Sequence, residues 1–190
     1  AKWQSIDSRP TPQWFKDAKF GIFIHWGLYS VPAWGPNESY AEWYLNGLLN
    51  GDTNRINYHN ENYGKDFSYR DFAQLFNPKK YNPGEWAKLF EKSGAKYVVL
   101  TSKHHDGFCL WPSEHSNGYN SFDTPAKRDL LGDLNKAVRD KGLKSGFYYS
   151  LYEWQHPDYP SNVATYVNNY MLPQFKDAVQ RYKPDIIFSD

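Results

Sequence analysis

Two adjacent histidines and a carboxylate follow an apolar run near the middle of the chain. Residues 97–102 read YVVLTS, and His104, His105 and Asp106 come soon after them. Imidazole and carboxylate groups can bind a metal ion, act as acids or bases, or form hydrogen bonds with the hydroxyl groups of a sugar. Histidines in such a position can also be satisfied core residues. These few residues alone leave all four interpretations open.

Three further apolar runs end in polar side chains. His25 closes the first run, Tyr148 lies near the end of the third, and Asp190 directly follows the fourth. All four runs are short and almost continuously apolar, as expected of parallel strands covered on both faces; they are residues 20–25, 97–102, 145–150 and 185–189. Taken singly, His25 could be a core histidine and Asp190 a helix N-cap. Because the carboxyl ends of parallel strands meet at one edge, we expect one shared site there.

Helical patterns separate the predicted strands. Residues 83–94 and 128–142 place apolar side chains at helical spacing and end at a glycine. Residues 162–182 form a third pattern, in which Pro173 is expected to kink or split the helix. Alternation of strands and helices predicts an α/β fold with a parallel sheet.

Four strands are too few for a closed barrel. A (β/α)₈ barrel typically needs about 250 residues, and the chain has 190. We therefore expect residues 1–190 to form the N-terminal half of a (β/α)₈-like (TIM) barrel, a partial catalytic domain with about four parallel strands; an open α/β sheet is the alternative. Residues 30–82, with a short helix expected near 68–76, are then a long insertion after the first strand, where barrel enzymes build substrate sites.

Composition narrows the class of ligand. The formal net charge of +1 gives no electrostatic footprint for nucleic acid or an anionic membrane, and no apolar run approaches the roughly 20 residues of a membrane span. Aromatic residues make up 19% of the chain, which favours a sugar-binding cleft, although the same rings could simply fill the core. Cys109 is the only cysteine, and its apolar neighbours predict a buried thiol.

The spacing of the histidines favours sugar chemistry over a metal site. His104 and His105 would point to opposite faces of a regular strand, so they converge only if the strand has ended or bulged. No HxH or HExxH motif occurs, so a metal site would have to assemble through space from His25, the histidine pair and Asp106. A retaining glycosidase instead needs two carboxyl groups about 5 Å apart. A carboxylate at a strand end, such as Asp190, is held rigidly enough to attack.

Six segments in order make the interpretation specific. They are WFKDAKFGIFIHWGLYSVPAW (14–34), AEWY (41–44), GAKYVVLTSKHHDGFCLW (94–111), KRDLLGDL (127–134), GFYYSLYEW (146–154) and YKPDIIFSD (182–190). Through them nearly the whole chain resembles the α-L-fucosidases of glycoside hydrolase family 29, most of all the relaxed-substrate branch. The resemblance implies a (β/α)₈-like catalytic domain, usually followed by a β-sandwich that these 190 residues do not include.

The resemblance also implies an activity. It is the retaining hydrolysis of terminal α-L-fucose from fucosylated oligosaccharides or glycoconjugates by double displacement, without a cofactor or a metal ion. The expected location is secreted, periplasmic or lysosomal. Neither nucleic acid nor membrane is an expected partner, and homo-oligomerisation stays open.

Residue by residue, the resemblance matches Asp190 to the family's aspartate nucleophile. Phe188 stands where the family has a tryptophan two residues before it. The fucose-binding positions match His25, Glu42, Trp43, His104, His105 and Tyr148, with Tyr149 as the alternative to Tyr148. The general acid/base is expected beyond residue 190, because neither Glu42 nor Glu153 is assigned that role. These 190 residues alone are therefore expected to be inactive.

Two neighbours of the histidine pair are expected to have structural roles. Asp106 would orient the turn or a histidine, and Lys103 would support the fold. One alternative concerns assembly: the fragment could be half of a split or duplicated barrel that associates with a partner chain carrying the remaining strands. Two other functions also remain open. One is a fucose-binding, lectin-like module without catalysis, which the presence of Asp190 disfavours. The other is a metal-dependent barrel hydrolase, which an ion between His25 and His104 would favour.

Overall fold

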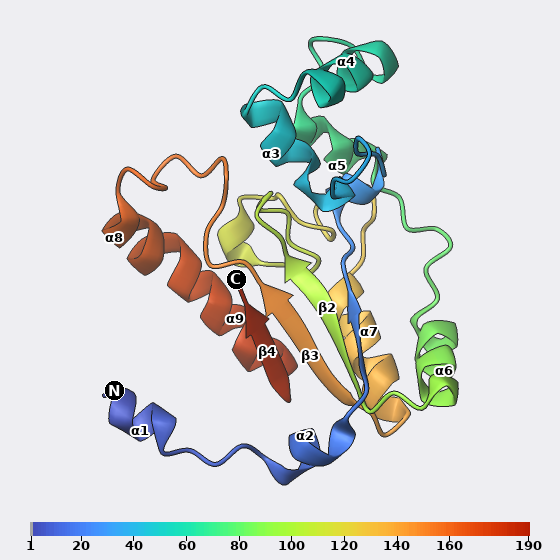
Figure 1. The fold of residues 1–190 in the computed structure, drawn as a ribbon, viewed down its shortest axis with the longest axis vertical. Coiled ribbons are helices and arrows are strands. Elements are labelled where there is room, and N and C mark those ends of the chain that lie inside the picture. The colour runs from blue at the N-terminus through green and yellow to red at the C-terminus, as the bar shows by residue number, and fades with distance from the viewer. Residues whose placement is uncertain (1) are drawn as a thin grey trace.

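A four-stranded parallel sheet organises this computed structural model, which describes residues 2–190 (Figure 1). The strands lie side by side in chain order: β1 (Gly21–Ile24), β2 (Tyr97–Lys103), β3 (Lys144–Tyr149) and β4 (Ile186–Ser189). Each predicted strand is confirmed to within one residue at either end. Within the described residues the sheet does not close, since β1 and β4 each pair with one neighbour only. All four strands point their carboxyl ends toward the same edge.

The predicted helices between the strands are also present. They are α6 (Pro83–Ser93) before β2 and α7 (Leu130–Asp140) before β3, which pack against each other beside the sheet. Asn82 caps α6 by accepting a hydrogen bond from the Glu85 amide. Gly94 ends the helix with a φ of 86°, a left-handed conformation that glycine adopts without strain.

The third helical pattern consists of three continuous segments. They are α8 (Val163–Tyr166), a π-helical segment η5 (Val167–Met171) and α9 (Leu172–Tyr182). Pro173 has no N–H to donate to the carbonyl four residues earlier, and the widened π-helical turn lies directly before it. The expected irregularity is therefore a local change of helical pitch, with α9 continuing beside β4 (Figure 1).

The insertion between β1 and β2 holds more helix than its sequence indicated. It contains η1 (Leu28–Ser30), η2 (Ala41–Trp43), α3 (Tyr44–Leu49), α4 (Thr53–Asn62), η3 (Tyr69–Asp71) and α5 (Phe72–Leu75). Only the helix near residues 68–76 was predicted. The segment α4 reads TNRINYHNEN, which has no apolar stripe; the Asp52 side chain caps it, and Arg55 and His59 are buried along it. Figure 1 shows α3 and α4 beyond the carboxyl ends of the strands.

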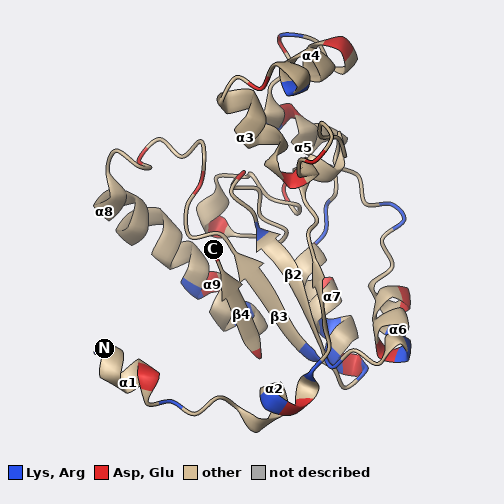
Figure 2. Cartoon of the chain, in the orientation of Figure 1, with Lys and Arg blue, Asp and Glu red and all other residues tan. Residues whose placement is uncertain are grey.

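Three short helices complete the described chain: α1 (Trp3–Asp7) and α2 (Gln13–Ala18) before the sheet, and η4 (Glu114–Ser116) after β2. Cys109 is fully buried, as predicted. Charged residues of both signs are scattered over the helices and loops, while the strands carry few of them (Figure 2). None of the helices described here is long and apolar enough to cross a membrane.

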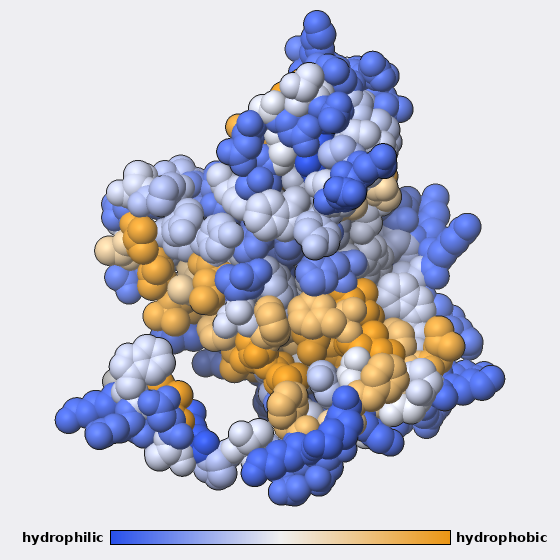
Figure 3. All heavy atoms as spheres, in the orientation of Figure 1, coloured by the Kyte–Doolittle hydropathy of each residue, from blue (hydrophilic) through white to orange (hydrophobic). Residues whose placement is uncertain are grey.

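One face of the sheet is only partly covered. Phe23 and Phe188, on the edge strands, are large apolar side chains on this face that remain substantially exposed. Apolar residues also gather around the sheet in the space-filling view (Figure 3). The burial of β2 and β3 between these edges is nearly complete. This pattern fits the inner face of a barrel wall.

Candidate active site

The chain leaves β2 in a tight turn that brings both histidines to one side. The β2–β3 pairing shifts register between Thr101 and Lys103, and the strand ends there. The His104 and His105 ring centroids consequently lie 4.6 Å apart. Gly107, with a φ of 80°, closes the turn by donating its amide to the His104 carbonyl at 3.0 Å. The strand end and bulge that convergence of the two histidines requires are therefore both present.

Asp190 lies at the carboxyl end of β4, beside this turn. The Tyr148 hydroxyl donates to Asp190 Oδ2 at 3.2 Å, and His105 Nε2 lies 3.5 Å from the same oxygen. Tyr148 and Phe188 are directly paired on β3 and β4, and their rings stack with centroids 5.9 Å apart. More than half of the Asp190 side chain is exposed, so the carboxylate is both oriented and accessible.

His25 joins the cluster from the end of β1. Its ring centroid lies 5.8 Å from those of His104 and Tyr148. Burial lowers the His25 pKa, and the nearby carboxylates of Glu42 and Asp190 partly oppose that effect. Glu42, in the insertion, therefore lies close enough to the same group of side chains to act on them electrostatically.

Aromatic rings enclose His105. Trp43 lies edge-on to it with centroids 6.4 Å apart, Tyr152 stacks on it at 4.3 Å, and Trp154 lies 5.0 Å away. Trp43 and Trp154 also contact each other at 5.4 Å. Tyr152 and Trp154 were not among the predicted site residues. Their signal in the sequence was their position shortly after the third strand, at the same edge as the other site residues.

The structure thus brings all eight predicted site residues to one edge of the sheet. They are His25, Glu42, Trp43, His104, His105, Tyr148, Phe188 and Asp190, and we call them the Asp190 cluster. Tyr149, the alternative to Tyr148, points elsewhere: its hydroxyl donates to Gln174 Oε1 at 2.7 Å. Alternation of side chains along β3 separates these two tyrosines.

The histidines of the cluster are uncharged near neutral pH. Burial, followed by the neighbouring His105 and His25, lowers the pKa of His104 to about 3. Burial also lowers the pKa of His105, although Asp190 opposes it. Among residues 2–190, no group donates to or accepts from His104 Nδ1, which is itself buried. A neutral imidazole with a free nitrogen suits a ligand hydroxyl group better than a charged ligand.

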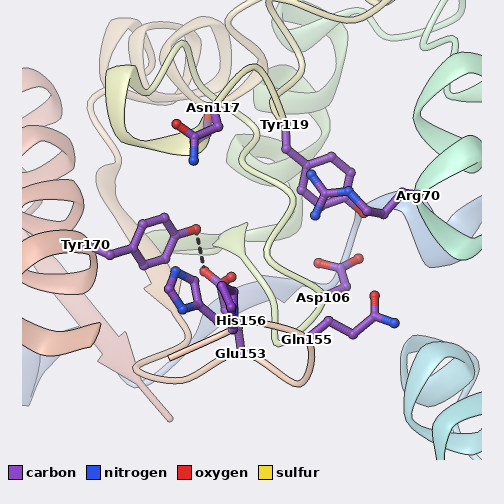
Figure 4. Close-up of a pocket in the computed structure, with 10 residues that line it drawn as sticks. Arg70, Asp106, Asn117, Tyr119, Glu153, Gln155, His156 and Tyr170 are labelled. Carbon is purple, nitrogen blue, oxygen red and sulfur yellow. Dashed lines mark hydrogen bonds between the residues drawn. The ribbon is translucent and has the colours of Figure 1, made fainter. Parts of the chain in front are cut away.

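Asp106 holds the turn rather than a histidine. Its Oδ2 accepts from the Tyr69 hydroxyl at 2.7 Å, and its Oδ1 accepts from the Phe108 amide at 3.1 Å. Asp106 and Glu153 line a separate cavity of about 140 Å³, together with Arg70, Tyr119 and Tyr170 (Figure 4). No member of the Asp190 cluster lines this cavity.

Lys103 and Glu153 form a buried ion pair behind the turn. Lys103 Nζ lies 2.7 Å from Glu153 Oε1, and the Tyr170 hydroxyl donates to the same oxygen at 2.7 Å. The Glu153 carboxylate is thus engaged away from the Asp190 cluster, in an arrangement suited to holding the fold. Within the described part of the chain, no three His, Cys, Asp or Glu side chains come together in a way that could hold a metal ion.

The buried carboxyl group of Asp106 makes stability depend on pH. Burial raises its pKa from 3.8 to about 6, so folding favours the protonated form. The stabilisation of the folded state by this protonated carboxyl group is complete below about pH 4 and is lost as the pH rises through 6. The free energy of unfolding of Asp106→Asn, minus that of wild type, should therefore increase by about 3 kcal/mol as the pH rises from 4 to 7. Urea titrations at several pH values measure this difference, with the surface variant Asp140→Asn as control; a constant difference would contradict it.

Known proteins resemble this chain along its whole length. The family model described as alpha-L-fucosidase matches residues 1–190. The chain belongs to the α-L-fucosidase family. The tissue alpha-L-fucosidase of Rattus norvegicus is 47% identical to this chain over 194 residues, covering 99% of it and 41% of the rat protein. The alpha-L-fucosidase of Dictyostelium discoideum is 46% identical over 201 residues, covering 99% of this chain and 43% of its own length.

Solved fucosidase structures share the fold. The Thermotoga maritima alpha-fucosidase superposes with a TM-score of 0.90 at 43% identity, covering all of this chain and 48% of the bacterial one. A GH29 alpha-L-fucosidase from Bacteroides thetaiotaomicron gives 0.79 at 34% identity, covering 96% of this chain and 41% of its own. The chain thus spans less than half the length of these relatives. Its sheet is the open, four-stranded N-terminal part of the barrel-like fucosidase fold, which confirms the predicted fold class.

Proposed function

We propose that the protein is a retaining exo-α-L-fucosidase that removes terminal α-L-fucose from oligosaccharides or glycoconjugates. The observation that supports this most is the placement of Asp190. Its accessible carboxylate stands at a strand end, within 3.5 Å of Tyr148 and His105, and beside neutral histidines and aromatic rings. Among the similar structures, the Thermotoga maritima enzyme has been solved in complex with fucose and with a mechanism based inhibitor.

The proposed reaction has two displacements at the anomeric carbon. In the first, a carboxylate oxygen of Asp190 forms a bond to that carbon while the bond to the leaving oxygen breaks, and a general acid protonates the leaving group. A covalent fucosyl-enzyme results. In the second, the same acid, now a base, removes a proton from water, which attacks the carbon and releases Asp190. The sugar keeps its α configuration.

We propose that the Asp190 cluster holds the fucose ring. The neutral histidines at 25, 104 and 105, together with the carboxylate of Glu42, supply donors and acceptors for its hydroxyl groups. Trp43 and Phe188 offer exposed apolar ring surface for the hydrophobic face and methyl group of a deoxy sugar. Tyr148 keeps the attacking carboxylate oriented through its hydrogen bond.

The general acid/base is proposed to come from outside residues 1–190. Glu153 is bound to Lys103 and Tyr170, and Glu42 fits better as a ligand for sugar hydroxyls. We accordingly propose that residues 1–190 are part of a catalytic barrel domain that a β-sandwich follows. The remainder of the protein then completes the site, and a secreted, periplasmic or lysosomal location fits a glycan-degrading enzyme. Oligomer formation remains to be measured.

The stereochemistry of hydrolysis tests this proposal. Proton NMR of the intact protein acting on an aryl α-L-fucoside should show α-L-fucose as the first product, before mutarotation. Release of β-L-fucose first would mean a single displacement and would remove Asp190 from the role of nucleophile. Binding of fucose without any release of the aryl group would favour the lectin-like alternative.

A further inference from the structure

We propose that Ser150 is a positioning residue that fixes the tautomer of His105, so that Nε2 of this histidine presents a lone pair to a substrate hydroxyl group. Ser150 follows β3 directly and is fully buried. The identity of the hydroxyl group rests on the proposed fucosidase function. The tautomer itself follows from the hydrogen bonds among Ser150, Tyr152 and His105, and it does not depend on that function.

The direction of each hydrogen bond follows from the groups involved. Ser150 Oγ lies 2.5 Å from the Tyr152 carbonyl oxygen, which can only accept, so the serine hydroxyl donates its one hydrogen there. Ser150 Oγ is also hydrogen-bonded to His105 Nδ1. Having no second hydrogen, the serine must accept this bond. His105 Nδ1 therefore carries the proton.

His105 holds only one ring proton. Burial lowers its pKa, so the ring is neutral near pH 7. With the proton on Nδ1, Nε2 has a bare lone pair. The Tyr152 ring stacks on the imidazole, with centroids 4.3 Å apart, and keeps the ring from turning over, which would put ring carbons where the two nitrogens lie.

The lone pair of Nε2 points into the Asp190 cluster. Nε2 lies 3.5 Å from the Tyr148 hydroxyl and 3.5 Å from Asp190 Oδ2. Tyr148 has a single hydrogen, and its contact with Asp190 is the shorter one, at 3.2 Å. Among the described residues, no other group donates to Nε2. It is therefore free to accept from a hydroxyl group bound beside Asp190.

The opposite tautomer would disturb the site in two ways. A proton on Nε2 would point at Asp190 Oδ2 and stabilise its negative charge, which weakens the carboxylate as a nucleophile. The substrate hydroxyl group would also meet a donor where it needs an acceptor. The Ser150 hydrogen bond prevents both effects by holding the proton on the far side of the ring.

Nitrogen NMR of the intact protein with ¹⁵N-labelled histidine tests the tautomer directly. The His105 signals are assigned by their loss in His105→Gln. Without substrate, Nδ1 should show the chemical shift of a protonated ring nitrogen and Nε2 that of an unprotonated one. The reverse pattern would overturn the proposal. Because this measurement needs no turnover, it decides the tautomer of His105 even in a protein that proves inactive on fucosides, and the same spectrum of Ser150→Ala decides the role of Ser150.

Enzyme kinetics then test whether the tautomer of His105 affects substrate binding. Ser150→Ala should raise KM for an aryl α-L-fucoside, and the inhibition constant of free fucose, each about tenfold. Ser150→Thr, which keeps the hydroxyl group, should restore both to within about threefold. Ser121→Ala is the matched control, because Ser121 is also fully buried and donates to a main-chain carbonyl, that of Arg128, but contacts no histidine.

The NMR and kinetic measurements together distinguish failure of the Ser150 proposal from failure of the proposed fucosidase function. An unchanged KM and an unchanged His105 spectrum in Ser150→Ala, beside an active wild type, would overturn the role of Ser150 while leaving the fucosidase function intact. A wild type that turns over no fucoside, but has the expected Nδ1–H tautomer, would overturn the proposed function alone.

Discussion

Replacing Asp190 by glycine in the intact protein is expected to lower kcat on an aryl α-L-fucoside at least about a thousandfold, a loss of roughly 4 kcal/mol of transition-state stabilisation. The physical reason is that glycine has no group that can bond to the anomeric carbon. The variant leaves space beside the sugar, so added azide should enter, attack in place of the carboxylate and give a fucosyl azide. Turnover with and without azide, followed by product analysis, measures both effects.

The control for this variant is Asp140→Gly on the surface of α7. The Asp140 and Asp190 side chains have nearly equal exposed fractions, 59% and 58%, but the Asp140 carboxylate pairs with Lys136 on the helix surface, away from the Asp190 cluster. The control should keep wild-type kcat. Undiminished turnover in Asp190→Gly would place the nucleophile elsewhere and would reopen the question of a different chemistry at the histidines.

The second large effect is expected on stability. Glu153→Gln should lower the free energy of unfolding by about 3–5 kcal/mol, because it leaves the Lys103 ammonium buried without its carboxylate. The Lys103 side chain is fully buried, and its Nζ lies 2.7 Å from Glu153 and over the Tyr149 ring at 4.3 Å from the centroid. Urea unfolding of the intact variant and wild type, at one pH, measures the difference.

A double variant and a surface pair complete this test. Lys103→Met with Glu153→Leu removes both charges and should recover most of the loss, since no buried charge then lacks a partner. Asp140→Asn breaks the exposed pair with Lys136 and should cost less than about 1 kcal/mol. A loss of comparable size in the surface variant, or almost none in Glu153→Gln, would show that water already reaches Lys103.

The Asp190 cluster and the Lys103–Glu153 pair lie on different sides of the histidine turn. The Asp190 cluster lies at the carboxyl edge of the sheet, where a ligand can reach it. Lys103 precedes the histidine turn directly and pairs with Glu153. The Tyr170 hydroxyl, on η5, donates to the same Glu153 carboxylate, as Figure 4 shows, and so links this ion pair to η5. Breaking the ion pair is therefore expected to shift the turn and, with it, the two histidines of the site.

The sheet and its order could be predicted from local sequence. Apolar runs of five or six residues, each followed by polar residues and separated by helical patterns, allow few arrangements other than a parallel α/β sheet. The chain order β1-β2-β3-β4 follows from the expected half-barrel, in which strands consecutive in the chain lie side by side. In contrast, α4 has no apolar stripe, and its stability depends on the Asp52 cap and on buried Arg55 and His59, which only tertiary contacts reveal.

His25, the histidine pair, Tyr148 and Asp190 could be named from strand position and family resemblance, because polar residues at parallel strand ends must meet at one edge. How these side chains lie relative to one another follows only from the tertiary structure. The bulge at the end of β2 turns His104 and His105 to one side, the alternation along β3 selects Tyr148 over Tyr149, and Lys103 withdraws Glu153 from the site. Such choices depend on distances of a few ångströms between residues far apart in the chain, which no local pattern encodes.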